Sequence, residues 1–129
     1  MDTEWHDEYE IGHSEIDRDH RGLIGVLGIL SKGYCDSDLV DTQIKTLELY
    51  VTVHFAREER LMRQGGYPGV GQHAALHQQF RANVKRMRAQ WTAGDTPELQ
   101  AEIAAELSRW LIDHIQGADR AFAPWIPTE

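Results

Sequence analysis

Apolar side chains recur every three or four residues along four stretches of the 129-residue chain. The stretches cover about 17–32, 38–64, 70–93 and 97–116, and glycines or prolines separate them. Spacings of three and four place side chains on one face of an α-helix, and no segment alternates convincingly with the period of two of a β-strand. Four such helices joined by short loops predict an all-α fold, an antiparallel up-down-up-down four-helix bundle.

The chain length corresponds to one domain, and the sequence contains no internal repeat, low-complexity tract or linker. We therefore predict a single domain over residues 1–129, with the bundle over 17–123. Residues 1–16 have no clear period and are predicted to form an extended N-terminal arm that packs on the bundle. In the first helix, Gly22, Gly25 and Gly28 follow one another at three-residue spacing, which would let another helix approach closely.

The charge balance argues against several kinds of partner. The formal net charge is −8, whereas nucleic acids and anionic membranes attract positively charged surfaces. The longest apolar run, Leu23 to Leu30, is far shorter than the roughly 20 residues of a membrane-spanning helix, and no secretory signal is visible. We therefore expect a cytoplasmic protein that neither binds nucleic acid nor inserts into a membrane.

The four apolar stripes also contain histidines and a glutamate. These are His20 on the first helix, His54 and Glu58 on the second, His73 and His77 on the third, and His114 on the fourth. Within each pair the spacing is four, so both side chains leave the same helical face. Every predicted helix therefore directs at least one imidazole towards the core.

This set of side chains predicts a metal site. One buried histidine with a hydrogen-bond partner is common, but each unpaired polar group in a core costs about 2 kcal/mol or more. A bound cation would provide a partner for all of these buried polar groups at once. Imidazoles with few carboxylates suit iron, copper, nickel or zinc, and five histidines exceed the ligands of one zinc ion. Two ions bridged by carboxylates would use the set well, and the one cysteine, Cys35, excludes a cysteine-rich site.

Two other classes of metal protein fit the residues less well. His73 and His77 have the spacing of the zinc ligands of zinc proteases, but Ala74 stands at the position of their general-base glutamate. Ferritin-like di-iron proteins need Glu-x-x-His twice, and the one match here runs from Glu10 to His13 in the predicted arm. The histidine-rich site thus differs from oxygen-activating carboxylate sites.

Four motifs in register resemble the hemerythrin family, and specifically its single-domain bacterial form. The family has a lone histidine on the first helix, followed by His-x-x-x-Glu, His-x-x-x-His and His-x-x-x-x-Asp. The matching residues are, in order, His20, His54 and Glu58, His73 and His77, and His114 and Asp119. The resemblance covers essentially the whole chain.

The resemblance implies a non-haem di-iron centre, with an oxo or hydroxo bridge, that binds dioxygen reversibly. The implied ligands are His73, His77 and His114 for one iron, His20 and His54 for the other, and Glu58 and Asp119 as bridges. The iron with two histidines would keep an open position for dioxygen. Matching apolar residues would line a dry pocket: Leu23, Phe55, Trp110, Leu111 and Ile115.

Two residues near these ligands carry further expectations. Glu59 points about 100° away from Glu58 on the helix and is expected at the surface or beside a ligand. His114 and Asp119 are five apart, which on a regular α-helix separates their directions by about 140°. We therefore predict a break or a π-type widening of the helix between them, helped by Gly117.

We predict a protein that stores or transports dioxygen in a bacterial cell and is not an enzyme. No spare acidic, lysine or tyrosine side chain lies on the inner stripes to relay protons, which favours a carrier or sensor over an oxidase. The alternatives are a module that senses dioxygen, nitric oxide or redox state, and an enzyme that processes peroxide or nitric oxide. Dioxygen is the expected partner, and the sequence identifies no protein partner.

Overall fold

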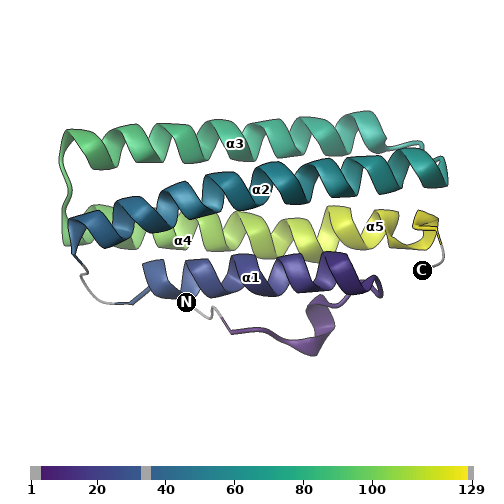
Figure 1. Cartoon of the computed structure of the whole chain (residues 1–129), viewed down its shortest axis with the longest axis horizontal. Coiled ribbons are helices and arrows are strands. Elements are labelled where there is room, and N and C mark those ends of the chain that lie inside the picture. Colours follow the sequence, from purple (N-terminus) through teal and green to yellow (C-terminus); the bar gives the residue numbers. More distant parts are fainter. Residues whose placement is uncertain (1–3, 33–35, 128–129) are drawn as a thin grey trace.

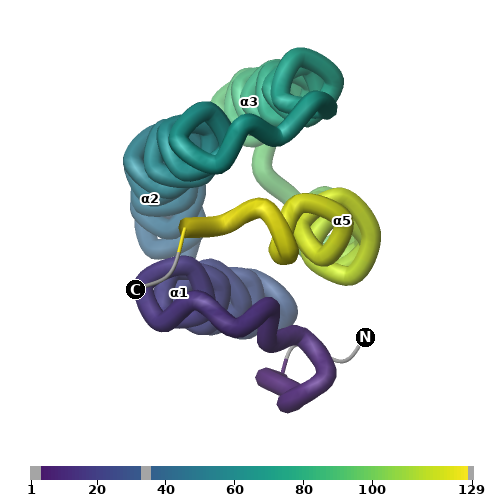
Figure 2. Tube along the Cα trace, turned by 90° about the vertical axis from the view of Figure 1, so that its right-hand side faces the viewer, coloured from purple at the N-terminus to yellow at the C-terminus, as the bar shows by residue number. Residues whose placement is uncertain are grey.

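The computed structural model describes residues 4–32 and 36–127, so Cys35 lies outside the described residues. Four long helices run side by side along the molecule (Figure 1). They are α1 (Ser14–Leu30), α2 (Ser37–Gly65), α3 (Val70–Ala93) and α4 (Pro97–His114). Consecutive helices pack on one another and α1 packs on α4, as the end-on view in Figure 2 shows. The described residues contain no strand, and the predicted all-α four-helix bundle is confirmed.

The C-terminal end of the bundle departs from regular α-helix. After α4, the chain continues through η2 (Ile115–Asp119), which is a π-helix, into the short α5 (Arg120–Phe122) and the 3-10 turn η3 (Ala123–Trp125). The predicted widening between His114 and Asp119 is therefore confirmed, and it takes the π form. The wider turn brings residues five apart onto one face of the helix.

The residues before α1 form an arm along the bundle (Figure 1). Its 3-10 turn, η1 (Asp7–Tyr9), buries Tyr9 in the core. The carboxylate of Asp17 accepts hydrogen bonds from the backbone N–H groups of Ile11 and Gly12, at 2.9 and 3.2 Å. These bonds hold the arm where α1 begins, at Ser14 rather than at the expected residue 17.

Side chains with helical spacing explain why these segments are helices and how they pack. In the half of the bundle near the α3–α4 connection the core is mainly aliphatic, with Leu27, Ile44, Leu47, Val84 and Leu107 all buried. At Gly22, a Cβ atom would overlap the ring of Tyr50 on α2, so glycine allows the close approach expected there. At Gly25, a Cβ would meet nothing within 4 Å, and close packing is not the reason for that glycine.

Candidate metal centre

Helices α2 and α3 each contribute two side chains to the polar half of the core. His54 and Glu58 are one turn apart on α2, and His73 and His77 are one turn apart on α3. All four are at most 3% exposed. The four-residue spacing turns each pair to one helical face, as the sequence predicts, and the apolar stripe that contains them turns that face inward.

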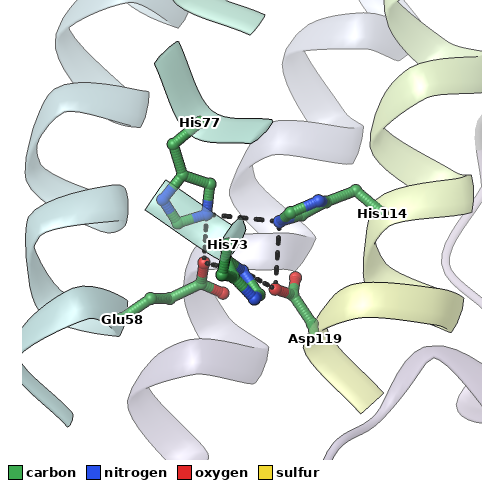
Figure 3. Close-up of side chains that lie close together, drawn as sticks. All are labelled: Glu58, His73, His77, His114 and Asp119. Carbon is green, nitrogen blue, oxygen red and sulfur yellow. Dashed lines mark hydrogen bonds and ion pairs between the residues drawn. The ribbon is translucent and has the colours of Figure 1, made fainter. Parts of the chain in front are cut away.

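One cluster of potential ligand atoms joins α2, α3, the end of α4 and the π-helical turn that follows it (Figure 3). Each of its residues offers an atom within 4.8 Å of all the others: Glu58, His73, His77, His114 and Asp119. The Nε2 atom of His77 lies 3.0 Å from Oε1 of Glu58 and 3.2 Å from Nε2 of His114. The Nε2 atoms of His73 and His114 lie 2.9 and 3.1 Å from Oδ1 of Asp119.

A second cluster shares both carboxylates with the first and adds two histidines, one from α1 and one from α2. It consists of His20, His54, Glu58 and Asp119. Nε2 of His20 lies 3.1 Å from Oδ2 of Asp119 and 3.3 Å from Oε2 of Glu58. Nε2 of His54 lies 3.1 Å from the same Oε2. The seven residues predicted from the sequence therefore all meet in the core.

The two carboxylates divide their oxygen atoms between the two clusters. Oε1 of Glu58 faces His73 and His77, while Oε2 faces His20 and His54. Asp119 repeats the pattern, with Oδ1 towards the first cluster and Oδ2 towards the second. A carboxylate that bridges two cations requires this arrangement.

The hydrogen bonding of these buried groups is incomplete. Among the described residues, nine buried side-chain nitrogen or oxygen atoms have no hydrogen-bond partner, and seven of them belong to His20, Glu58, His73 and Asp119. Buried polar groups are normally paired, because each unpaired one costs free energy. Nitrogen lone pairs and carboxylate oxygens that converge without hydrogen bonds fit bound cations, and imidazole-rich sites suit iron.

Electrostatics within the cluster oppose the cost of burial. Burial lowers the pKa of His20, but its contacts with Asp119 and Glu58 outweigh this effect and raise the pKa to about 10. The same opposing causes raise the pKa of His73 to about 9. Burial raises the pKa of the Glu58 carboxyl, but the surrounding histidines lower it well below its usual value. The metal-free cluster thus favours charged imidazoles and carboxylates, and a cation would replace the bound protons.

Two carboxylates contact the outward-facing nitrogens of cluster histidines. Glu59, expected at the surface or beside a ligand, lies 2.9 Å from Nδ1 of His77. Asp19 lies 2.9 Å from Nδ1 of His54 and also accepts a hydrogen bond from Arg57. Asp19 was not predicted from the sequence, because its partner is on another helix and no spacing within α1 reveals the contact.

Aromatic side chains of the core pack against several of the clustered histidines. Phe55 stacks on His77 with 3.8 Å between ring centroids and 2° between ring planes, and Trp110 stacks on His114 at 4.5 Å and 15°. The other residues predicted for the pocket, Leu23, Leu111 and Ile115, are fully buried, whereas Trp110 is half-buried. Sequence reasoning missed two further rings: Phe80, which packs on Trp110, and Phe122, which packs edge-on against His73.

None of the helices in the described ranges, 4–32 and 36–127, combines the length and the apolar character needed to cross a membrane.

Comparisons with known proteins agree with this geometry. Residues 12–126 match the family model described as the hemerythrin HHE cation binding domain. The chain is 36% identical to a bacteriohemerythrin of Stenotrophomonas maltophilia, over 92% of this chain and 78% of that protein. It is 28% identical to a myohemerythrin of Riftia pachyptila, over 89% and 86% of the two chains. Its fold is similar to the crystal structure of a hemerythrin with a leucine-to-alanine substitution (TM-score 0.80, 20% identity, 89% and 88% coverage).

Proposed function

The chain belongs to the hemerythrin family, and from this premise we propose that it stores or delivers dioxygen in the cytoplasm of a bacterial cell. Membership carries the chemistry of the family, which is reversible binding of dioxygen at a non-haem di-iron centre without enzymatic turnover. The relatives described above do not favour the sensing and enzymatic alternatives. In this proposal the arm and the bundle act together as one hemerythrin-like domain.

The seven clustered residues would hold the two irons. His73, His77 and His114 would bind one iron, His20 and His54 the other, and Glu58 and Asp119 both. The observation that carries this assignment is the division of each carboxylate's oxygens between the two clusters. One cluster has three histidines and the other two, so the second leaves room for an added ligand.

When bound, the iron pair supplies the electrons that bind dioxygen, and the surrounding side chains have three tasks. The helices orient the five imidazoles towards the two proposed iron positions. Phe55 and Trp110 fix two of those rings by stacking. Leu23, Phe55, Trp110, Leu111 and Ile115 are proposed to line the dioxygen pocket and to exclude water and proton donors.

Metal analysis and a gas titration test the proposal. The reduced, iron-loaded chain should contain two irons and develop a visible absorption band on anaerobic titration with dioxygen, and the band should disappear when the gas is removed. One metal ion per chain, or a spectrum that does not revert, contradicts the proposal.

Substitution of Glu58 tests the bridging role. Glu58→Gln should lower the iron content at both positions together, because one residue serves both clusters. Glu106→Gln is the matched control, since Glu106 lies on the surface of α4 and pairs with Arg86. Loss of a single iron in Glu58→Gln would contradict the assignment of Glu58 as a bridge.

A further inference from the structure

The two clusters each have one histidine whose outward nitrogen meets a carboxylate. In the two-histidine cluster, Nδ1 of His54 lies 2.9 Å from Oδ2 of Asp19. In the three-histidine cluster, Nδ1 of His77 lies 2.9 Å from Oε2 of Glu59. Because the Nε2 atom of each ring faces its cluster, Nδ1 carries the hydrogen and donates it to the carboxylate.

The arginines next to these two carboxylates differ. Arg57 donates a hydrogen bond to Asp19, and its Nε lies 3.2 Å from Glu15, so two carboxylates hold the guanidinium. Arg63 lies 3.8 Å from Glu59, beyond hydrogen-bond distance. The side chain of Arg57 is 24% exposed, whereas that of Arg63 is 64% exposed and largely solvated. Asp19 is therefore hydrogen bonded to a cation, whereas the cation beside Glu59 is more distant and more solvated.

This difference changes how strongly each imidazole donates electrons. A carboxylate that accepts the Nδ1 hydrogen makes the ring more basic and a stronger ligand, and such a ligand favours the higher oxidation state of a metal. A cation bound to the carboxylate withdraws charge and weakens the effect. His54 should therefore donate less strongly than His77.

We propose that Arg57, acting through Asp19 on His54, raises the reduction potential of the two-histidine iron and so keeps it ferrous. Arg57 and Asp19 are positioning residues, because Asp19 meets His54 at its outward Nδ1, not at the Nε2 that faces the cluster, and Arg57 acts through Asp19. The inference rests on the proposed di-iron function and adds a determinant of its redox balance. A site that must return to the ferrous state after releasing dioxygen needs such a determinant.

The position of Arg57 makes the inference testable without disturbing the core. Asp19 and Arg57 line a groove between α1 and α2 together with Leu49 and Val53, which are 73% and 61% exposed. A substitution of Arg57 therefore changes a side chain at the wall of an open groove, and the bundle should still form. Arg63, on the same helix, offers a matched control.

The first experiment compares the iron-loaded Arg57→Gln, Arg57→Lys and Arg63→Gln proteins with the unsubstituted chain. Equilibrium redox titration should give a lower midpoint potential for Arg57→Gln, an intermediate value for Arg57→Lys and an unchanged value for Arg63→Gln. The dioxygen-bound form of Arg57→Gln should also autoxidise several-fold faster. An unchanged or higher potential in Arg57→Gln, or an equal shift in Arg63→Gln, overturns the inference.

The second experiment reads the hydrogen bond without iron. In the zinc-loaded protein, which is diamagnetic, the Nδ1–H proton of His54 should resonate further downfield in Arg57→Gln and further upfield in Asp19→Asn. An unmoved His54 signal in Arg57→Gln overturns the inference, whatever the iron content. Failure of the unsubstituted chain to take up two irons would instead overturn the proposed function, so the two failures are distinguishable.

Discussion

The half of the bundle near the α3–α4 connection is filled with aliphatic side chains, whereas the half near the α2–α3 connection holds imidazoles and carboxylates. In the aliphatic half, the buried amide of Gln100 donates hydrogen bonds to the carbonyls of Leu30 and Lys32, at 3.0 and 3.2 Å. In the polar half, the oxygens of Glu58 and Asp119 have no hydrogen-bond partner.

The two halves of the same four helices therefore have different roles. Burial of apolar surface in the aliphatic half stabilises the fold without a ligand, at about 25 cal/mol per Å². The same helices continue into the polar half and hold the proposed metal ligands close together. Because the polar half is completed by cations, its stability should depend on metal and pH, and that of the aliphatic half should not.

The largest expected effect is that of a cavity in the aliphatic half. Leu47→Ala removes a fully buried side chain and should lower the free energy of unfolding by about 2–5 kcal/mol. Leu49→Ala, on the same helix but 73% exposed, should change it by less than about 0.5 kcal/mol. Chemical denaturation of the metal-free chain measures both. Equal effects of the two substitutions would show that the buried aliphatic core contributes no more to stability than the exposed groove.

Removal of the metal should act on the polar half and lower the free energy of unfolding by an amount similar to that expected for Leu47→Ala. A ligand that binds the folded state alone stabilises it by about 4 kcal/mol when its concentration is 1,000 times its dissociation constant. Thermal unfolding of the iron-loaded and chelator-treated protein should show this difference. Leu47→Ala should lower stability by the same amount in both states, and a Leu47→Ala effect that depends on iron would show that the two halves are coupled.

Opening the proposed pocket should affect the chemistry of the site as well as the stability of the fold. Leu23→Ala and Trp110→Ala should admit water to the iron pair and speed autoxidation several-fold, because both side chains lie beside a proposed ligand. The visible spectrum of the dioxygen-bound protein, followed over time, measures the rate. Leu49→Ala is the control, and rates equal to it would assign Leu23 and Trp110 to packing alone.

A further expected effect is a pH dependence confined to the metal-free protein. The pKa of His20 is raised to about 10 and that of His73 to about 9, above the ordinary value of 6.5. The stability contributed by these groups is therefore fully present below pH 6.5 and is lost as the pH rises through 9 to 10.

Melting temperatures at pH 6 and pH 10 check this expectation. The metal-free chain should melt at a lower temperature at pH 10, while the iron-loaded chain should lack this component, because metal-bound imidazoles are already neutral. The same alkaline loss in both forms would mean that metal and protons do not compete for these histidines.

Most of the fold could be read from the sequence, because it depends on spacing within single helices, whereas the full set of seven site residues was predicted from the resemblance to the hemerythrin family. Steps of three and four predicted the helices, and a spacing of four placed His54 with Glu58. Because the family resemblance placed both His114 and Asp119 in the site, their spacing of five predicted an irregular turn, which the structure shows to be π-helical. The contacts of Asp19 with His54 and of Gly22 with Tyr50 could not be assigned in this way.

The sequence by itself determined which side chains face inward, since the period of a helix is a local property of the backbone. Only the tertiary structure decided how far each helix is rotated and shifted against its neighbours, because those offsets result from packing summed over the whole core. The offsets divide the oxygens of Glu58 and Asp119 between two clusters. They also bring Asp19 to His54 and Glu59 to His77, and so set the outer hydrogen bonds of the site.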